Sequence, residues 1–315
     1  MFTLLLLVVG FALLIKGADV LVEGASSLAR RLHISPLVVG LTVVAFGTSA
    51  PELVVNIIAN LQGESALAIG NIIGSNIANI LLILGVAGMI RPLSVTRNTV
   101  WREIPFSLLA MLVLAALAND ALIDGAGVSV LSRIDGLVLL AFFLVFLSYS
   151  FSKSKPVTTD LREERLPSVL RSTMYITLGI LGLALGGKLV VDSATTIAIM
   201  LGLSQTFIGL TLVALGTSLP ELATTIVAAH KRKTDIAIGN IVGSNIFNVF
   251  WILGLSAIIH PISYTMILNR DVGVAVLASV LLMSFVLGNG RSLQRGQGFV
   301  LVLFYIVYLV TLTLS

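Results

Sequence analysis

Two segments of this chain are near-copies of each other, and each carries a glutamate within apolar sequence. Ser35–Ser94 and Ser204–Ser263 align without a gap at an offset of 169 residues, and 30 of the 60 paired positions are identical. The shared blocks are Gly-Thr-Ser-x-Pro-Glu, at 47–52 and 216–221, and Gly-Asn-x-x-Gly-Ser-Asn-x-x-Asn, at 70–79 and 239–248. An internal repeat of this kind sets the domain organisation more strongly than length does.

The composition is that of an all-α integral membrane protein. Hydrophobic residues make up 57% and charged residues 11% of the chain, whereas a soluble domain carries about 25% charged residues. Because about 20 apolar residues cross a bilayer as a helix, we predict ten spans, at 2–22, 35–60, 65–90, 102–118, 133–152, 171–191, 204–229, 235–260, 271–288 and 296–314. Glu23 and Asp192 follow two of these spans directly and are expected at the membrane interface.

Lysine and arginine are distributed unevenly between the predicted connections. The odd connections hold 15 of the 19 basic residues and the even connections hold 2, with Lys16 and Lys188 inside helices. This bias places the odd connections in the cytoplasm and both termini outside it, in a multi-pass protein of the plasma membrane. Five helices per repeat is an odd number, so the second repeat is inverted. We predict repeats at 1–152 and 171–315, joined by a cytoplasmic linker at 153–170. Inverted repeats with interrupted helices are the architecture of secondary transporters.

The first shared block predicts a helix break that is rich in oxygen. Pro51 has no N–H, so the carbonyl of Gly47 loses its helical partner. Thr48 and Ser49 add hydroxyls, and Glu52 lies one turn after Thr48 on the same face. The second repeat supplies the same groups from Thr217, Ser218 and Glu221. A buried acid within the membrane marks a functional site by default, because an unpaired charge there costs several kcal/mol.

The second shared block predicts further oxygens on the next helix of each repeat. Ser75 and Asn79 share a face, as do Ser244 and Asn248. Two carboxylates with hydroxyl, amide and carbonyl oxygens form a site for a hard cation, and Ca²⁺ takes 6–8 such ligands. Alternative roles stay open at this point. Threonine and serine hydroxyls often bond to the preceding turn of their own helix, and the two asparagines could serve only to join helices.

Several other classes of function lack their signatures. The chain has no cysteine and only three, widely spaced histidines, so thiolate and imidazole metal sites are not expected. Neither H-E-x-x-H nor G-x-S-x-G occurs, so we expect no enzyme activity. The net charge of +4 fits basic cytoplasmic loops better than a nucleic-acid partner. We expect the lipid bilayer as the surroundings, no cofactor and no obligate protein partner.

At these residues the chain resembles the sodium/calcium exchanger branch of the cation/calcium exchanger superfamily, and its short linker is similar to that of prokaryotic members. The resemblance implies a central Ca²⁺ site and neighbouring Na⁺ sites, with the first and sixth helices sliding against the rest. The implied Ca²⁺ ligands are Glu52, Glu221, Thr48 and Thr217; the implied Na⁺ ligands are the same acids with Ser49, Ser218, Ser75, Ser244 and the carbonyls of Ala45 and Ala214, and Asn79 and Asn248 border the centre.

One position departs from part of the family. Some members, including potassium-dependent ones, carry aspartate at the place of Asn248, so the asparagine argues against K⁺ co-transport. Proton-coupled members usually carry glutamine near the places of Asn79 and Asn248, so asparagine favours Na⁺.

The leading hypothesis is thus a Na⁺/Ca²⁺ antiporter that exports Ca²⁺ from the cytoplasm. The alternative within the same class is an antiporter that exchanges H⁺ for Ca²⁺ or for another divalent cation, since two buried carboxylates also accept protons. A passive channel is a weaker hypothesis, because a centre with two enclosed acids suits occlusion better than a continuous pore.

Overall fold

Helices form almost all of the structure, a computed structural model that describes residues 2–95, 99–123, 125, 127–152, 167–201, 214–288 and 290–314. In chain order, with η marking a π-helical stretch, they are α1 (Phe2–Arg31), α2 (Pro36–Val39), η1 (Gly40–Val44), α3 (Ala45–Thr48), α4 (Ala50–Leu61), α5 (Ser65–Ala78), η2 (Asn79–Leu84), α6 (Gly85–Ile90), η3 (Thr99–Glu103), α7 (Ile104–Leu117), α8 (Asp120–Ile123), α9 (Arg133–Ser152), α10 (Val169–Met200), α12 (Ala214–Thr217), α13 (Leu219–His230), α14 (Thr234–Ile246), η5 (Phe247–Leu253), α15 (Gly254–Ile259), α16 (Leu268–Gly288) and α17 (Arg295–Leu314).

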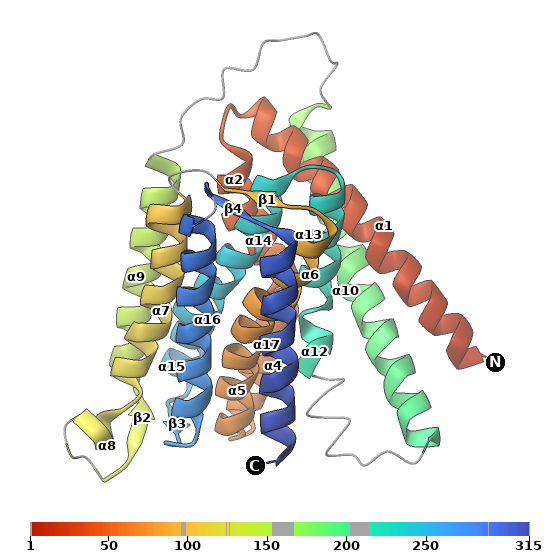
Figure 1. The fold of residues 1–315 in the computed structure, drawn as a ribbon. Helices are drawn as coiled ribbons and strands as arrows, with labels where there is room; N and C mark the ends of the chain where they lie inside the picture. The colour runs from red at the N-terminus through yellow and green to blue at the C-terminus, as the bar shows by residue number, and fades with distance from the viewer. Residues whose placement is uncertain are drawn as a thin grey trace.

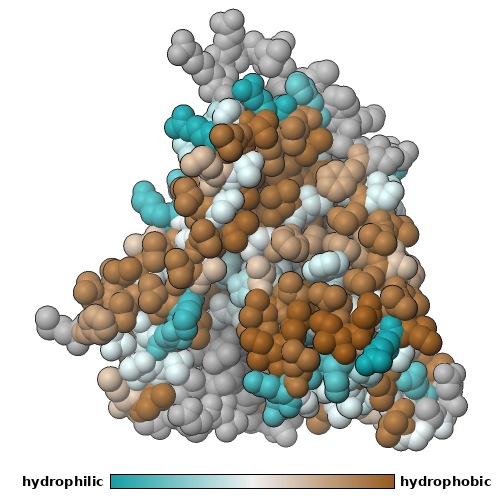
Figure 2. Space-filling model, turned by 180° about the vertical axis from the view of Figure 1, so that it is seen from behind, coloured by the Kyte–Doolittle hydropathy of each residue, from teal (hydrophilic) through white to brown (hydrophobic). Residues whose placement is uncertain are grey.

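The helices of the described residues are long and apolar enough for a multi-pass membrane protein. Eight could each cross a bilayer, and the pair Pro36–Thr48 and Ala50–Leu61, bent by 47° at the break between them, makes a ninth span. The predicted span 204–229 begins in residues that lie outside the described part of the chain. The count of ten, the five-plus-five inverted division and most of the linker therefore stay predictions. Figure 2 shows apolar side chains over most of one face, with polar side chains gathered mainly at its upper and lower ends.

Two helices run well past their predicted ends. α1 continues to Arg31 and α10 to Met200, so Glu23 and Asp192 lie inside helices and not where the helices end. The sequence-based boundaries stopped at these charged residues because a charge is unfavourable next to lipid. The small residues that follow each charge continue the helix.

α1 and α10 lie side by side along their length and diverge together from the other helices (Figure 1). Glycines permit this close approach. A Cβ added at Gly17 would lie 2.8 Å from the backbone nitrogen of Leu183, and one at Gly179 would lie 2.7 Å from Leu21. Small residues at such an interface let two membrane helices pack backbone against backbone. The pair packs in an apolar cluster distinct from the main core, and this cluster also includes Val39, Val44 and Ala228 of the neighbouring helices.

The two repeat-related helices α5–η2–α6 and α14–η5–α15 form the centre of the molecule. Of their most apolar 18-residue windows, 78% and 83% of the residues are buried, far more than in any outer helix of the described chain. Each contains a π-helical stretch, η2 and η5, at corresponding positions. Such stretches are uncommon and frequently occur at functional sites.

Two short antiparallel ladders connect the halves at their loops. β1 (Leu93–Ser94) pairs with β4 (Ser292–Leu293), and β2 (Ser129–Leu131) pairs with β3 (Ile262–Tyr264). Each ladder joins a loop of the first half to a loop of the second. The loops that end α6 and α15 are thereby fixed to the opposite half.

Candidate cation-binding site

Each Gly-Thr-Ser-x-Pro-Glu block folds as a helix break followed directly by a new helix. Ser49 has φ −84° and ψ 7°, and its repeat partner Ser218 has φ −86° and ψ 3°, so both leave the helical conformation in the same way. Proline in the first turn of each following helix needs no hydrogen-bond partner there. Glu52 and Glu221 then lie in the first turns of α4 and α13, where the helix dipole stabilises a negative charge.

The two glutamates are buried and are each bonded to the opposite repeat. Both are 1% exposed. The Ser49 hydroxyl donates to Oε1 of Glu221 at 2.9 Å, and the Ser218 hydroxyl lies 3.5 Å from Oε1 of Glu52. These crossed contacts bring the two helix breaks together from opposite halves of the chain.

The serines of the next helices complete a chain of hydroxyls around the acids. Ser244 donates to Oε1 of Glu221 at 3.3 Å and lies 2.9 Å from the Ser49 hydroxyl. In the related half, the hydroxyls of Ser218 and Ser75 lie 3.2 Å apart. All four serines are buried. They contact the acids and one another, so in this structure their partners are not merely the preceding turns of their own helices.

The threonines of the breaks bond to two asparagines that the sequence did not single out. Thr48 donates to Oδ1 of Asn240 at 3.0 Å, and Thr217 donates to Oδ1 of Asn71 at 3.4 Å. The Asn240 amide also donates to Thr225 at 3.1 Å. The signal for both asparagines was present, because each is the second residue of the repeated Gly-Asn-x-x-Gly-Ser-Asn-x-x-Asn block.

Four further asparagines form hydrogen bonds between the two repeats. Asn79 donates through Nδ2 to Oδ1 of Asn245, and Asn248 donates through Nδ2 to Oδ1 of Asn76, both at 2.9 Å. The sequence predicted positions for Asn79 and Asn248 but missed Asn76 and Asn245, which also lie in the repeated block. Since the amide nitrogens form the bonds between the halves, the carbonyl oxygens of Asn79 and Asn248 remain available for another partner.

Four buried oxygens of this cluster lack any hydrogen-bond donor within the described residues. They are Oε2 of Glu52, Oε2 of Glu221, Oδ1 of Asn79 and Oδ1 of Asn248, which form two repeat-related pairs. None of the described Lys, Arg or His side chains forms an ion pair with either glutamate. A buried oxygen without a donor costs about 1–3 kcal/mol, and more when charged. Two carboxylate and two amide oxygens arranged in this way are suited to a hard cation.

The two backbone carbonyls predicted as Na⁺ ligands are less clearly placed. The carbonyl of Ala45 accepts the Ser49 N–H at 3.0 Å; the Thr48 hydroxyl lies 3.3 Å from it but closer, at 3.0 Å, to its other acceptor, Oδ1 of Asn240. Ala214 is the first residue of α12, and the residues just before it lie outside the described part of the chain.

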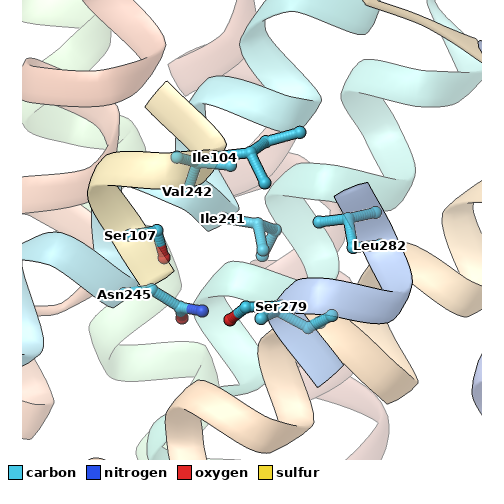
Figure 3. A pocket seen from close by; sticks show the side chains of 8 residues that line it. Ile104, Ser107, Ile241, Val242, Asn245, Ser279 and Leu282 are labelled. Atoms are coloured by element: carbon cyan, nitrogen blue, oxygen red, sulfur yellow. The ribbon is translucent and has the colours of Figure 1, made fainter. Parts of the chain in front are cut away.

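A small cavity lies behind Asn245. Its volume is about 10 Å³, and its polar lining is Asn245, Ser107 and Ser279. Figure 3 shows the side chains of Asn245 and Ser279 pointing toward one another across it. A cavity of this size holds one water molecule, which would lie beside Asn245. In the described part of the first repeat, Met111 lies beside the repeat-related residue Asn76 instead.

Known proteins are similar to this chain over most of its length. The model of the family described as sodium/calcium exchanger protein matches residues 2–152 and 171–314. This chain belongs to that family. It is 40% identical over 306 residues to the putative antiporter CaxA of Alkalimonas amylolytica, covering 95% of each chain. It is 35% identical to the sodium/calcium exchanger MaX1 of Methanosarcina acetivorans, covering 98% of this chain and 97% of that protein.

A solved structure and a more distant relative complete the comparison. The structure of the sodium-calcium exchanger NCX_Mj matches with a TM-score of 0.86 and 32% identity over 99% of both chains. The Ca²⁺/H⁺ antiporter ChaA of Bacillus subtilis is 24% identical, covering 85% of this chain and 81% of that protein. The chain is therefore a multi-pass membrane protein of a family of cation/Ca²⁺ exchangers, which are transporters.

Proposed function

We propose that this protein is an antiporter that exchanges Na⁺ for Ca²⁺ by alternating access. The observation that carries the proposal is the set of four unpartnered oxygens on Glu52, Glu221, Asn79 and Asn248. Two ionised carboxylates carry a charge of −2, which one Ca²⁺ neutralises. With the hydroxyls of the two break threonines, this set approaches the 6–8 oxygen ligands that Ca²⁺ prefers.

Na⁺ would use the same acids together with the surrounding serines. In the structure the hydroxyls of Ser49, Ser218, Ser75 and Ser244 bond to the acids or to each other. A hydroxyl also has two lone pairs, so each serine can turn an oxygen toward a monovalent cation while it keeps a hydrogen bond. Because both ions need Glu52 and Glu221, their occupancies exclude each other, and this competition is the physical basis of exchange.

The close pair α1 and α10 is the proposed moving unit. Its two helices pack more extensively on each other than on any other described element, and the pair contacts both helix breaks. A Cβ added at Gly47 would lie 2.4 Å from Ile180, and one added at Gly216 would lie 2.3 Å from Val191, both on α10. Displacement of this pair would therefore expose one break or the other, which supports alternating access.

The orientation and the remaining properties of the antiporter belong to the same proposal. With both termini outside the cytoplasm and the linker 153–170 inside, Na⁺ entry would drive Ca²⁺ export across the plasma membrane. We propose two inverted five-helix repeats at 1–152 and 171–315 as its domains, no resident cofactor, no catalysed chemical reaction and no obligate protein partner. If more than two Na⁺ exchange for one Ca²⁺, transport would respond to membrane potential.

Exchange of H⁺ for Ca²⁺ is the second candidate, because a relative named a Ca²⁺/H⁺ antiporter shares the family. Buried carboxylates can carry protons as well as metal ions. Two observations support Na⁺. The relative named a sodium/calcium exchanger is 35% identical, against 24% for the proton-coupled one. The hydroxyls around the acids also offer ligands that a proton would not need.

Radioactive Ca²⁺ uptake into proteoliposomes tests the coupling when the Na⁺ and H⁺ gradients are imposed separately. We expect an outward Na⁺ gradient alone to drive uptake, and a pH gradient alone to drive none. Uptake driven only by the pH gradient would show that H⁺, and not Na⁺, is the ion exchanged for Ca²⁺. The Glu52→Gln variant is the control for uptake that does not pass through the site.

A further inference from the structure

A cavity of about 200 Å³ lies between α10 and the two helix breaks. Pro51 and Pro220, which precede the two glutamates, line it together with Thr217. On the opposite wall, α10 contributes Lys188 and Asp192. The cavity thus borders both helix breaks, and Lys188 and Asp192 are the only charged residues among its described lining.

The position of this charged pair within the helix requires an explanation. Asp192 lies 8 residues before Met200, where α10 ends, which is about 12 Å at 1.5 Å per residue. Charged side chains inside membrane helices almost always face a bundle interior or a water-filled cavity. The side chains of Lys188 and Asp192 are 72% and 58% exposed, and both line the cavity. We infer that water reaches these two charged side chains where they line the cavity.

The repeat-related interface is closed, so the cavity is not a general property of the fold. By the offset of 169 residues, α10 and α4 correspond to α1 and α13. α1 packs along α13, where Ala228 is fully buried, and Asp19 of α1 forms an ion pair with Lys231 at 2.6 Å. On α4, in contrast, Val54 and Ile58 are 55% and 49% exposed. Among the described residues, α1 and α13 are thus packed together, whereas their repeat partners α10 and α4 leave a cavity between them.

We propose that Asp192 is an outer cation-binding residue that loads the buried site through this cavity, with Lys188 as its tethered counter-ion. The Lys188 amine lies 2.9 Å from Oδ2 of Asp192, four residues apart on one helix face. An exposed pair of this kind is weak, so an entering cation can displace the amine. A carboxylate at the entrance of a cleft also raises the local concentration of cations. This inference rests on the proposed cation exchange.

The test measures the Ca²⁺ concentration for half-maximal uptake at each membrane face, in right-side-out and inside-out vesicles. For Asp192→Asn we expect it to rise about three- to fivefold at the face where α10 ends with Met200, predicted to be extracytoplasmic, with the opposite face and the maximal rate unchanged. An effect of this size corresponds to one exposed unit charge near a binding cation in water, and raised salt should reduce it. Lys188→Gln should lower the concentration, because Asp192 then lacks its competitor.

Two control variants separate a local charge effect from a structural one. Asp192→Glu keeps the charge and should behave as wild type. Glu23→Gln removes the repeat-related carboxylate, which is exposed on α1 and does not line the cavity, and should leave the affinity at the Met200 face unchanged.

Each contrary outcome overturns the inference. The inference is wrong if Asp192→Asn matches wild type at both faces, if it shifts both faces equally, or if Lys188→Gln weakens uptake. Wild-type protein without Ca²⁺ uptake would instead reject the proposed function, so the two failures are distinguishable.

Discussion

Gly243→Ala should disturb the candidate site without replacing any of its proposed ligand residues. A Cβ at Gly243 would lie 2.5 Å from the carbonyl oxygen of Leu41 and 2.7 Å from the Cβ of Ala45. An ordinary contact begins at about 3.4 Å, so α14 must separate from η1 by about 0.9 Å, the difference between 3.4 and 2.5 Å. The obstacle is backbone, which cannot rotate away as a side chain would.

The separation acts directly on the contacts that hold the break of the first repeat. Asn240 and Ser244 lie on α14 beside Gly243 and bond to Thr48 and Ser49 at 3.0 and 2.9 Å. A shift of about 0.9 Å lengthens both beyond hydrogen-bond range. Two hydrogen bonds of about 1 kcal/mol each correspond to a fall in Ca²⁺ affinity of at least about tenfold. Overpacking should also cost about 1–3 kcal/mol of stability.

Purified protein in detergent gives both quantities, from Ca²⁺ titration and from thermal unfolding without Ca²⁺. The matched control is Gly273→Ala on α16, where no described atom lies within 4 Å of the added Cβ; it should change neither quantity. Gly243→Ala with wild-type affinity and wild-type unfolding temperature would refute the packing argument. Lower stability with unchanged affinity would show that the contacts between α14 and the first break do not hold the ligands.

Three further predictions test separate parts of the structure. Glu52→Gln or Glu221→Gln should abolish Ca²⁺ uptake and leave a folded, monodisperse protein on size-exclusion chromatography; wild-type uptake in either would remove that residue from the site. Gly17→Val should push α1 from α10, because an added Cβ lies 2.8 Å from backbone, and lower the unfolding temperature by several degrees; an unchanged temperature would mean that the pair is not tightly packed. Asn60→Ala removes two hydrogen bonds of 2.8 Å to carbonyls at the end of α15. It should lower the free energy of unfolding by about 2 kcal/mol, measured by thermal unfolding. An unchanged unfolding temperature would show that these bonds make no net contribution to stability.

The helix breaks and their acids could be predicted because the signals are local. Proline and glycine disturb a helix wherever it packs, so Pro51 and Pro220 alone fix where α4 and α13 begin. Because the block is repeated, the helix break and the buried acid predicted at Glu52 are also predicted at Glu221. The crossed contacts of each acid with a serine of the other half, in contrast, have no signal in the sequence.

The asparagine contacts could not be predicted, because they depend on the meeting of two distant segments. Nothing near Asn76 or Asn245 indicates that each amide pairs with an asparagine of the other half. The predicted C-terminal ends of α1 and α10 were wrong for a related reason. Glu23 and Asp192 look like helix ends in sequence, and only the packed structure shows that the helix continues past them and that Asp192 lines a cavity. The π-helical stretches have no local sequence signal at all.

Equilibrium binding of radioactive Ca²⁺ to the purified protein tests most directly whether the two buried glutamates hold one cation between them. We expect one Ca²⁺ per chain, displaced by Na⁺, and loss of that binding in Glu52→Gln and in Glu221→Gln alike. Binding that survives either substitution at wild-type affinity, or that Na⁺ fails to displace, would contradict the account.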